Sequence, residues 1–290
     1  PAGAGFISRR SRRCIMERPV ENTRSLFDYD AGEPPGVRAT GIDVTIRDLT
    51  YQAAPERWVR AYLVAPTPDQ PQLAGLLFLH PGPGSRATFL AEAVTLAGMG
   101  AVSLLVDAPW ADGGAAAWGR AVTDPGEAVW EHVRTVIDLR RGLDLLIAQP
   151  GVDPERIGFV GHSFGALIGA VLAGVDRRVK AAVLMAGTGR FADVAAVNLP
   201  DLQGERLEHY RRTLAEIGRA APPPLLFQSA LRDEVFSEEQ SREFFEWAND
   251  PKSLEWYDAG HYLDEAARRD RIAWLAGRLS LERREPDRSR

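Results

Sequence analysis

A serine between two glycines is the first feature of chemical interest. The stretch RIGFVGHSFGALIGA places Ser163 between Gly161 and Gly165. The apolar residues before this pentapeptide predict a buried strand, and the small and apolar residues after it predict a helix. Gly-x-Ser-x-Gly at such a junction is typical of a tight turn that exposes a serine hydroxyl as a nucleophile, because only glycine fits at the flanking positions. The plain alternative is a glycine-rich turn that packs a helix onto a sheet.

A serine hydroxyl needs a base, and one histidine is well placed to be it. A serine becomes a good nucleophile only when a neighbouring group takes its proton. His261, in DAGHYL, directly follows the last predicted strand, and chains with this turn place nucleophile, acid and base in that order. We therefore expect His261 as the base. His132 is expected to pack within a helix or lie on its surface, and His209 is expected to be solvated.

A carboxylate should support the base. The segment LRDEVF, after the predicted strand PPLLFQSA, offers Asp233 and Glu234. Asp233 suits the loop position better, and it would fix the tautomer of His261 and stabilise the imidazolium. Glu234 is the alternative acid.

Two N–H groups should hold the oxyanion that forms during acyl transfer. The first is expected from Phe164, which directly follows the serine. The second should come from the loop HPGPG, where Pro81 and Pro83 have no N–H and Gly82 is the natural donor. The alternative for this loop is a plain proline–glycine turn.

Alternating strand and helix patterns supply the elements that must position these residues. Continuous apolar runs separated by helical spacing predict a mostly parallel sheet, and two strands of alternating polarity at the start predict an antiparallel edge. Helices end at Gly or Pro, as they often do. The predicted strands are residues 42–52, 57–66, 73–82, 101–109, 156–161, 179–187, 223–230 and 252–260, and the predicted helices include 88–100, 129–150, 237–249 and 264–280.

The sequence predicts one catalytic domain with extensions. Residues 1–40 are expected to form a tail or arm, with Met16 as a possible native start and residues 1–15 as an upstream extension. The domain is expected to cover 41–280, residues 190–222 could form a small cap, and 281–290 form a charged tail.

Composition excludes several classes. The 290 residues carry a net charge of −5, which argues against nucleic acid as a partner. A single cysteine, Cys14, allows no intrachain disulfide. There is no apolar run of the roughly 18–20 residues that span a bilayer, so no membrane is expected, and without a secretory signal a cytoplasmic location is the default. The sequence has no zinc-ligand spacing, Walker loop or Rossmann glycine pattern, and the oligomeric state cannot be inferred.

In this order, LLFLHPGPGSR, GFVGHSFGA, LRDEV and DAGHYL resemble the α/β-hydrolase superfamily over about residues 41–280. The run VIDLRRGLDLLIAQPGVDPERIGFVGHS is similar to the small esterases of the dienelactone hydrolase and acetyl xylan esterase type. The resemblance implies an eight-stranded, mostly parallel twisted sheet with helices on both faces. It also implies Ser163 as nucleophile, Asp233 as acid and His261 as base, with an acyl-enzyme and neither metal nor organic cofactor.

Two departures limit the resemblance. Dienelactone hydrolases proper have Cys where this chain has Ser163, so their particular substrate does not carry over. The oxyanion loop reads His-Pro-Gly where many relatives read His-Gly-Gly, so the residue after His80 has no N–H to donate.

The expected substrate is a small or medium carboxylic ester bound beyond the carboxyl ends of the strands. Trp110 and Trp118, in the loop APWADGGAAAWGR, would wall the pocket or else pack the loop onto the body. The candidate pocket residues are His80, Trp110, Trp118, His162 and Tyr262. The alternatives are a peptidase or amidase of the prolyl-oligopeptidase type, a thioesterase or acyltransferase, and a non-catalytic binding module, which the presence of Ser, Asp and His disfavours.

Overall fold

The computed structural model describes residues 43–67, 71–113, 125–189 and 223–282. The chain divides into two compact units, Pro1–Thr40 and Gly41–Arg290, and the described residues belong to the second. The predicted arm, the predicted cap and residues 283–290 lie outside them and stay predictions. Leu281, which opens the predicted tail, is buried.

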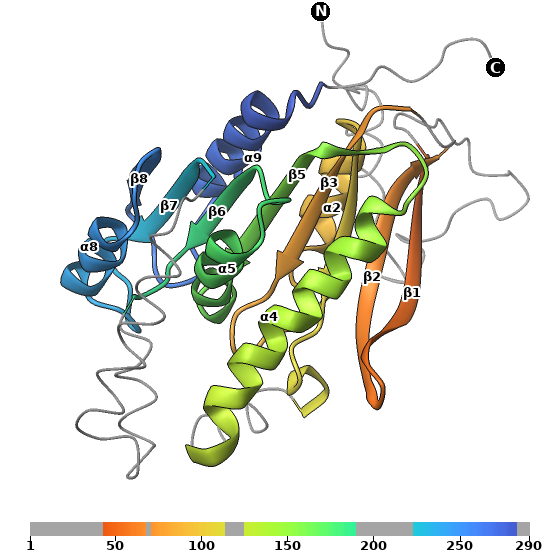
Figure 1. Cartoon of the computed structure of the whole chain (residues 1–290). Coiled ribbons are helices and arrows are strands. Elements are labelled where there is room, and N and C mark those ends of the chain that lie inside the picture. The colour runs from red at the N-terminus through yellow and green to blue at the C-terminus, as the bar shows by residue number, and fades with distance from the viewer. Residues whose placement is uncertain (1–42, 68–70, 114–124, 190–222, 283–290) are drawn as a thin grey trace, which may run out of the picture. The chain divides into compact units, whose positions relative to one another are not determined.

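The described chain forms one mixed sheet of eight strands, as predicted (Figure 1). The first two strands pair antiparallel with each other, β2 pairs antiparallel with β4, and every other pairing is parallel. The spatial order is β1-β2-β4-β3-β5-β6-β7-β8. The strands are β1 (Asp43–Ala54), β2 (Arg57–Thr67), β3 (Leu73–Leu79), β4 (Ala101–Val106), β5 (Val152–His162), β6 (Ala181–Met185), β7 (Leu225–Ala230) and β8 (Lys252–Tyr257).

Helices cover both faces of this sheet, which is the reason for the continuous apolar strands. One face carries α4, α5 and α8, and the other carries α2 and α9 (Figure 1). The helices are α2 (Leu90–Ala97), α4 (Pro125–Ile147), α5 (Phe164–Val175), α8 (Glu238–Trp247) and α9 (Glu265–Leu279). In the described part of the chain, no helix is both long and apolar enough to cross a bilayer.

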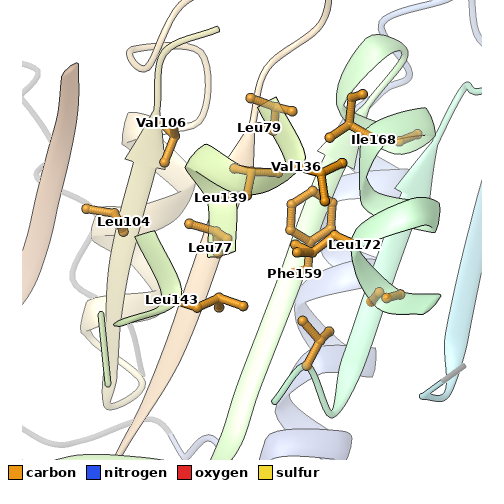
Figure 2. Packing of buried hydrophobic residues seen from close by; sticks show 14 of the residues in the cluster. Leu77, Leu79, Leu104, Val106, Val136, Leu139, Leu143, Phe159, Ile168 and Leu172 are labelled. Carbon is orange, nitrogen blue, oxygen red and sulfur yellow. The ribbon is translucent and has the colours of Figure 1, made fainter. Parts of the chain in front are cut away.

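Alternate residues of the central strands feed two separate cores. In β3, Leu77 and Leu79 pack under α4 and α5, while Leu76 and Phe78 pack under α2 and α9, because successive side chains of a strand point to opposite faces. Figure 2 shows the first core, in which the labelled side chains of β3, β4 and β5 meet those of α4 and α5. The labelled residues are Leu77, Leu79, Leu104, Val106, Val136, Leu139, Leu143, Phe159, Ile168 and Leu172.

The strand ends differ from the prediction in a way that matters for the site. The last strand ends at Tyr257 rather than directly before His261, so Asp258–His261 form a loop. Strand β5 starts earlier than predicted and runs to His162, directly before the serine. Because parallel strands end at one edge of a sheet, the loops after β3, β5, β7 and β8 meet there.

Candidate active site

The turn between β5 and α5 holds Ser163 in a strained conformation. Its φ of 54° and ψ of −109° lie where a residue with a side chain is rarely found. A β-carbon on Gly161 would collide with the backbone of Gly165, and one on Gly165 would collide with the Leu79 carbonyl. The two flanking glycines are therefore required by contact between the helix and the strand ends, which is the physical basis of the sequence pattern.

Strand β6 fixes this turn from the side. The Ser163 N–H donates to the Met185 carbonyl at 2.8 Å, and the Ser163 carbonyl accepts the Ala166 N–H at 3.0 Å. With its backbone held in this way, the half-buried Ser163 keeps its strained conformation.

The His261 ring is tied to Asp233. His261 Nδ1 lies 3.0 Å from both carboxylate oxygens of Asp233, and both side chains are buried. Burial alone raises the pKa of Asp233, but hydrogen bonds from His261 and from the N–H groups of Phe236 and Val235 outweigh it, so this pKa lies below its ordinary value. A charged Asp233 that accepts a hydrogen bond from Nδ1–H keeps the ring proton on Nδ1, and this leaves Nε2 as the nitrogen that can take up a proton.

Both carboxylates of the LRDEVF segment reach His261, at different atoms. Glu234 Oε2 accepts the backbone N–H of His261 at 3.1 Å, whereas Asp233 accepts the ring N–H. The sequence left these two residues as alternatives for one role, and the structure gives them two separate contacts.

The residue before the serine also contacts the His261 loop. His162 Nε2 donates to the His261 carbonyl at 2.8 Å, and the centroids of the two rings lie 5.1 Å apart. Burial lowers the pKa of His162 to about 4, so the ring is neutral near pH 7 and its proton is on Nε2, which faces the carbonyl. The end of β5 and the His261 loop are thus in direct contact.

His80 orients the predicted oxyanion loop through both ring nitrogens. The Ala108 N–H donates to His80 Nε2 at 2.9 Å, so the proton of the neutral ring is on Nδ1, which donates to the Pro81 carbonyl at 2.6 Å. Burial lowers the pKa of His80. Because the peptide that follows Pro81 is planar and trans, fixing its carbonyl also fixes the direction of the Gly82 N–H.

Trp110 links the two segments that carry the predicted oxyanion donors. Its Nε1–H donates to the Gly82 carbonyl at 2.7 Å, and its ring packs edge-on against Phe164, with centroids 4.7 Å apart. The His132 ring lies on Phe164 as well, at 5.5 Å, and burial lowers the pKa of His132 to about 3. Trp110 therefore packs its loop onto the body of the domain, and its contribution to a pocket wall stays a prediction.

The other expected pocket residues divide by exposure. His80, Trp110 and His162 are buried, whereas Tyr262 is 61% exposed beside the His261 ring, and Trp118 lies outside the described residues. No motif pointed to Arg86, which is buried and contacts Asp107 by its backbone N–H and its guanidinium. In the residues that the structure describes, no three His, Cys, Asp or Glu side chains are grouped to hold a metal ion.

The mostly parallel eight-stranded sheet with helices on both faces is the fold of an α/β hydrolase. The chain belongs to the alpha/beta hydrolase family, whose model matches residues 76–286. A search of curated proteins found no match.

Solved esterases share this fold at low sequence identity. The acetyl xylan esterase from Paenibacillus sp. R4 is 18% identical, with a TM-score of 0.62 over 83% of this chain and 90% of that one. Acetyl xylan esterase 1 from Thermoanaerobacterium sp. JW/SL YS485 is 14% identical, with a TM-score of 0.64 over 81% and 88%. A cold-adapted esterase from an Arctic intertidal metagenomic library is 20% identical, with a TM-score of 0.63 over 81% and 94%. The structural neighbours also include a dienelactone hydrolase.

Proposed function

We propose that this protein is a serine hydrolase that cleaves carboxylic esters of small or medium size. Ser163 is the nucleophile, His261 the base and Asp233 the acid, with the N–H groups of Phe164 and Gly82 as oxyanion donors. The observation that carries the proposal is the buried His261–Asp233 hydrogen bond at 3.0 Å, because it supports a base whose loop contacts the strained serine turn through His162. The esterase-like fold of the neighbours supports the same reaction class.

The first half of the reaction forms an acyl-enzyme. His261 Nε2 takes the proton of the Ser163 hydroxyl as its oxygen attacks the ester carbonyl carbon. The carbonyl π electrons move to the oxygen, and the N–H groups of Gly82 and Phe164 hold the resulting oxyanion. When the intermediate collapses, the C–O bond to the alcohol breaks and His261 gives its proton to the leaving alkoxide.

The second half releases the acid. Water enters in place of the alcohol, and His261 takes one of its protons as the water oxygen attacks the acyl carbon. Collapse of this second intermediate breaks the bond to Ser163, whose oxygen recovers the proton from His261. Throughout the cycle Asp233 stays ionised and stabilises the imidazolium, in agreement with a pKa below its ordinary value.

Labelling with a fluorophosphonate tests the nucleophile. We expect one label per chain, on the peptide that contains Ser163, and none in Ser163→Ala. The same variant should lose turnover of p-nitrophenyl acetate and butyrate by about 10⁴-fold or more, with an unchanged circular dichroism spectrum. Ser253→Ala, on strand β8, is the matched control. Full turnover in Ser163→Ala, or a label on another peptide, would rule out the proposed nucleophile.

A substrate panel tests the reaction class. Esters and anilides of the same acyl groups, with acyl chains of increasing length, should show faster cleavage of the esters. Faster cleavage of the anilides would identify an amidase or peptidase instead, and a preference for thioesters would identify a thioesterase.

A further inference from the structure

We propose that His162 and Glu234 are positioning residues that hold the backbone of His261 by its two ends. They form what we call the His261 clamp: His162 binds the carbonyl and Glu234 binds the N–H. The inference rests on the proposed function, because it assigns the clamp the task of keeping the His261 imidazole in its working place. Ser163, His261 and Asp233 would carry out the reaction. His162 and Glu234 would position His261 and exchange no proton with the substrate.

The loop that carries His261 explains why its backbone needs such partners. Gly260 and Leu263 close a tight turn through a 2.9 Å hydrogen bond between the Gly260 carbonyl and the Leu263 N–H, and Leu263 has a positive φ of 59°. His261 is inside this turn, beyond the end of β8, so no neighbouring strand pairs with its N–H or carbonyl. His261 is only 5% exposed, and buried backbone groups need a partner. Two side chains supply these partners.

The partner of the carbonyl comes from the nucleophile turn itself. His162 is adjacent to Ser163 in the chain, is 2% exposed, and donates from Nε2 at 2.8 Å. Strand β6 pairs with His162 at Met185, so the donor has little freedom to move. Any displacement of the His261 carbonyl must therefore stretch a hydrogen bond to the residue that precedes the serine. This contact couples the place of the base directly to the place of the nucleophile.

The partner of the N–H comes from the loop of the acid. Glu234 Oε2 accepts at 3.1 Å, and its neighbour Asp233 accepts from the ring of the same histidine. One loop therefore holds both the ring and the backbone of His261. If only Nδ1 of the His261 ring were held, the imidazole could still change its direction whenever the backbone moved. With the backbone fixed as well, Nε2 keeps one direction.

The clamp should affect the chemical step rather than substrate binding. Displacing a reacting group by about 1 Å can cost about 10²-fold in rate. The sequence suggested His162 as a pocket residue, but its ring is 2% exposed and its Nε2–H is bonded to the His261 carbonyl, so the clamp assigns it a backbone contact in place of a contact with the ester. A loosened clamp should therefore lower kcat and leave KM nearly unchanged.

Two matched pairs of substitutions test the clamp through its hydrogen bonds. Gln at position 162 places its amide nitrogen near the position of Nε2, while Asn is one methylene too short to reach the carbonyl. We expect His162→Asn to lower kcat for p-nitrophenyl acetate, and the rate of fluorophosphonate labelling, by about 10- to 100-fold. His162→Gln should recover most of both. In the same way, Glu234→Gln keeps an acceptor and should stay within about threefold of the wild type, whereas Glu234→Ala should fall about tenfold.

The controls separate this inference from the proposed function. Glu246→Ala, which removes an exposed carboxylate of α8, should keep wild-type kcat and KM. Equal kcat for the Asn and Gln variants at position 162, with Ser163→Ala inactive, would overturn the clamp and leave the proposed function standing. An equal loss in Glu234→Gln and Glu234→Ala would overturn it as well, because charge rather than the hydrogen bond would then be responsible. Full turnover in Ser163→Ala would instead refute the function itself.

Discussion

The two halves of strand β5 hold distant segments by different chemical means. In the first half, which we call the start of β5, the Arg156 guanidinium donates to three carbonyls, those of Leu279 at 2.8 Å, Gln72 at 2.6 Å and Ser280 at 2.6 Å. At its end, a single N–H of His162 donates to the His261 carbonyl. Each side chain spans about a hundred residues of sequence, 123 to Leu279 and 99 to His261.

This difference separates architecture from chemistry. A guanidinium stays charged at every physiological pH and offers five donors in a fixed geometry. It therefore suits a purely structural contact, such as the one that connects the end of α9 and the residue before β3 to β5. The edge that carries the proposed site uses the imidazoles of His80 and His162 instead, whose pKa values burial lowers, so each ring is neutral near pH 7 and carries one proton. Substitutions at the start of β5 should change stability alone, and substitutions at its end should change the chemistry.

The largest expected effect comes from substituting Asp233, the proposed acid. Asp233→Asn keeps the size of the side chain but replaces a charged acceptor with a neutral amide that can favour the wrong tautomer of His261. We expect kcat to fall by about 10³- to 10⁴-fold, and steady-state kinetics with p-nitrophenyl acetate measures it. A loss of less than tenfold would mean that Asp233 does not support the base.

An effect of intermediate size is expected from low pH, which should destabilise the fold through His162. His162 has a pKa of about 4 in the folded chain and an ordinary pKa near 6.5 when unfolded, so the unfolded state binds more protons between these values. The stability present near neutral pH is therefore lost as the pH falls. For His162 alone the loss is about 2 kcal/mol between about pH 7 and about pH 5.

Urea unfolding at these two pH values measures the slope, and variants assign it. His162→Gln should flatten the dependence of the unfolding free energy on pH, whereas a substitution of Arg156 should keep the wild-type slope. Identical slopes in the wild type and in His162→Gln would show that this imidazole does not contribute to the acid sensitivity.

The smallest expected effect lies at the opposite end of the strand. Arg156→Met removes three hydrogen bonds to carbonyls and should lower the free energy of unfolding by about 1–2 kcal/mol, measured by urea unfolding. Ester turnover should stay at the wild-type level. Arg141→Met, at an exposed ion pair with Asp144, is the control and should change stability by less than about 0.5 kcal/mol. If Arg156→Met also lowered kcat, the division between the two ends of β5 would be wrong.

Much of the fold could be predicted because it depends on local patterns. Alternating polarity in the first two strands and apolar runs in the later ones identified the sheet. The Gly-x-Ser-x-Gly sequence located the turn, since contact with the Leu79 carbonyl requires glycine at position 165. These patterns do not define the residue at which a strand ends. The last strand looked longer than it is, because Ala259 and Gly260 continue a small and apolar sequence, while the Ala259 N–H turns back onto the Tyr257 carbonyl at 2.8 Å.

The roles of several side chains at the site could not be read from the sequence. His162, for example, could only be judged by its neighbour in the chain, while its partner, the His261 carbonyl, lies 99 residues away. The same holds for Trp110, whose indole N–H meets the Gly82 carbonyl only after β3 and β4 pair. Backbone acceptors leave no trace in residue type, so such contacts appear only once the chain is folded.

The hydrogen bond from Trp110 to the Gly82 carbonyl has a consequence for catalysis. Because the indole and the His80 ring already hold the loop, the proposed donor at Gly82 should be preorganised, and little reorganisation should accompany the appearance of negative charge on an incoming ester. Boronic acids, which become tetrahedral and negatively charged only when a serine oxygen adds to boron, should then bind without first ordering the loop, so their association should show a single phase with no slow loop-ordering step.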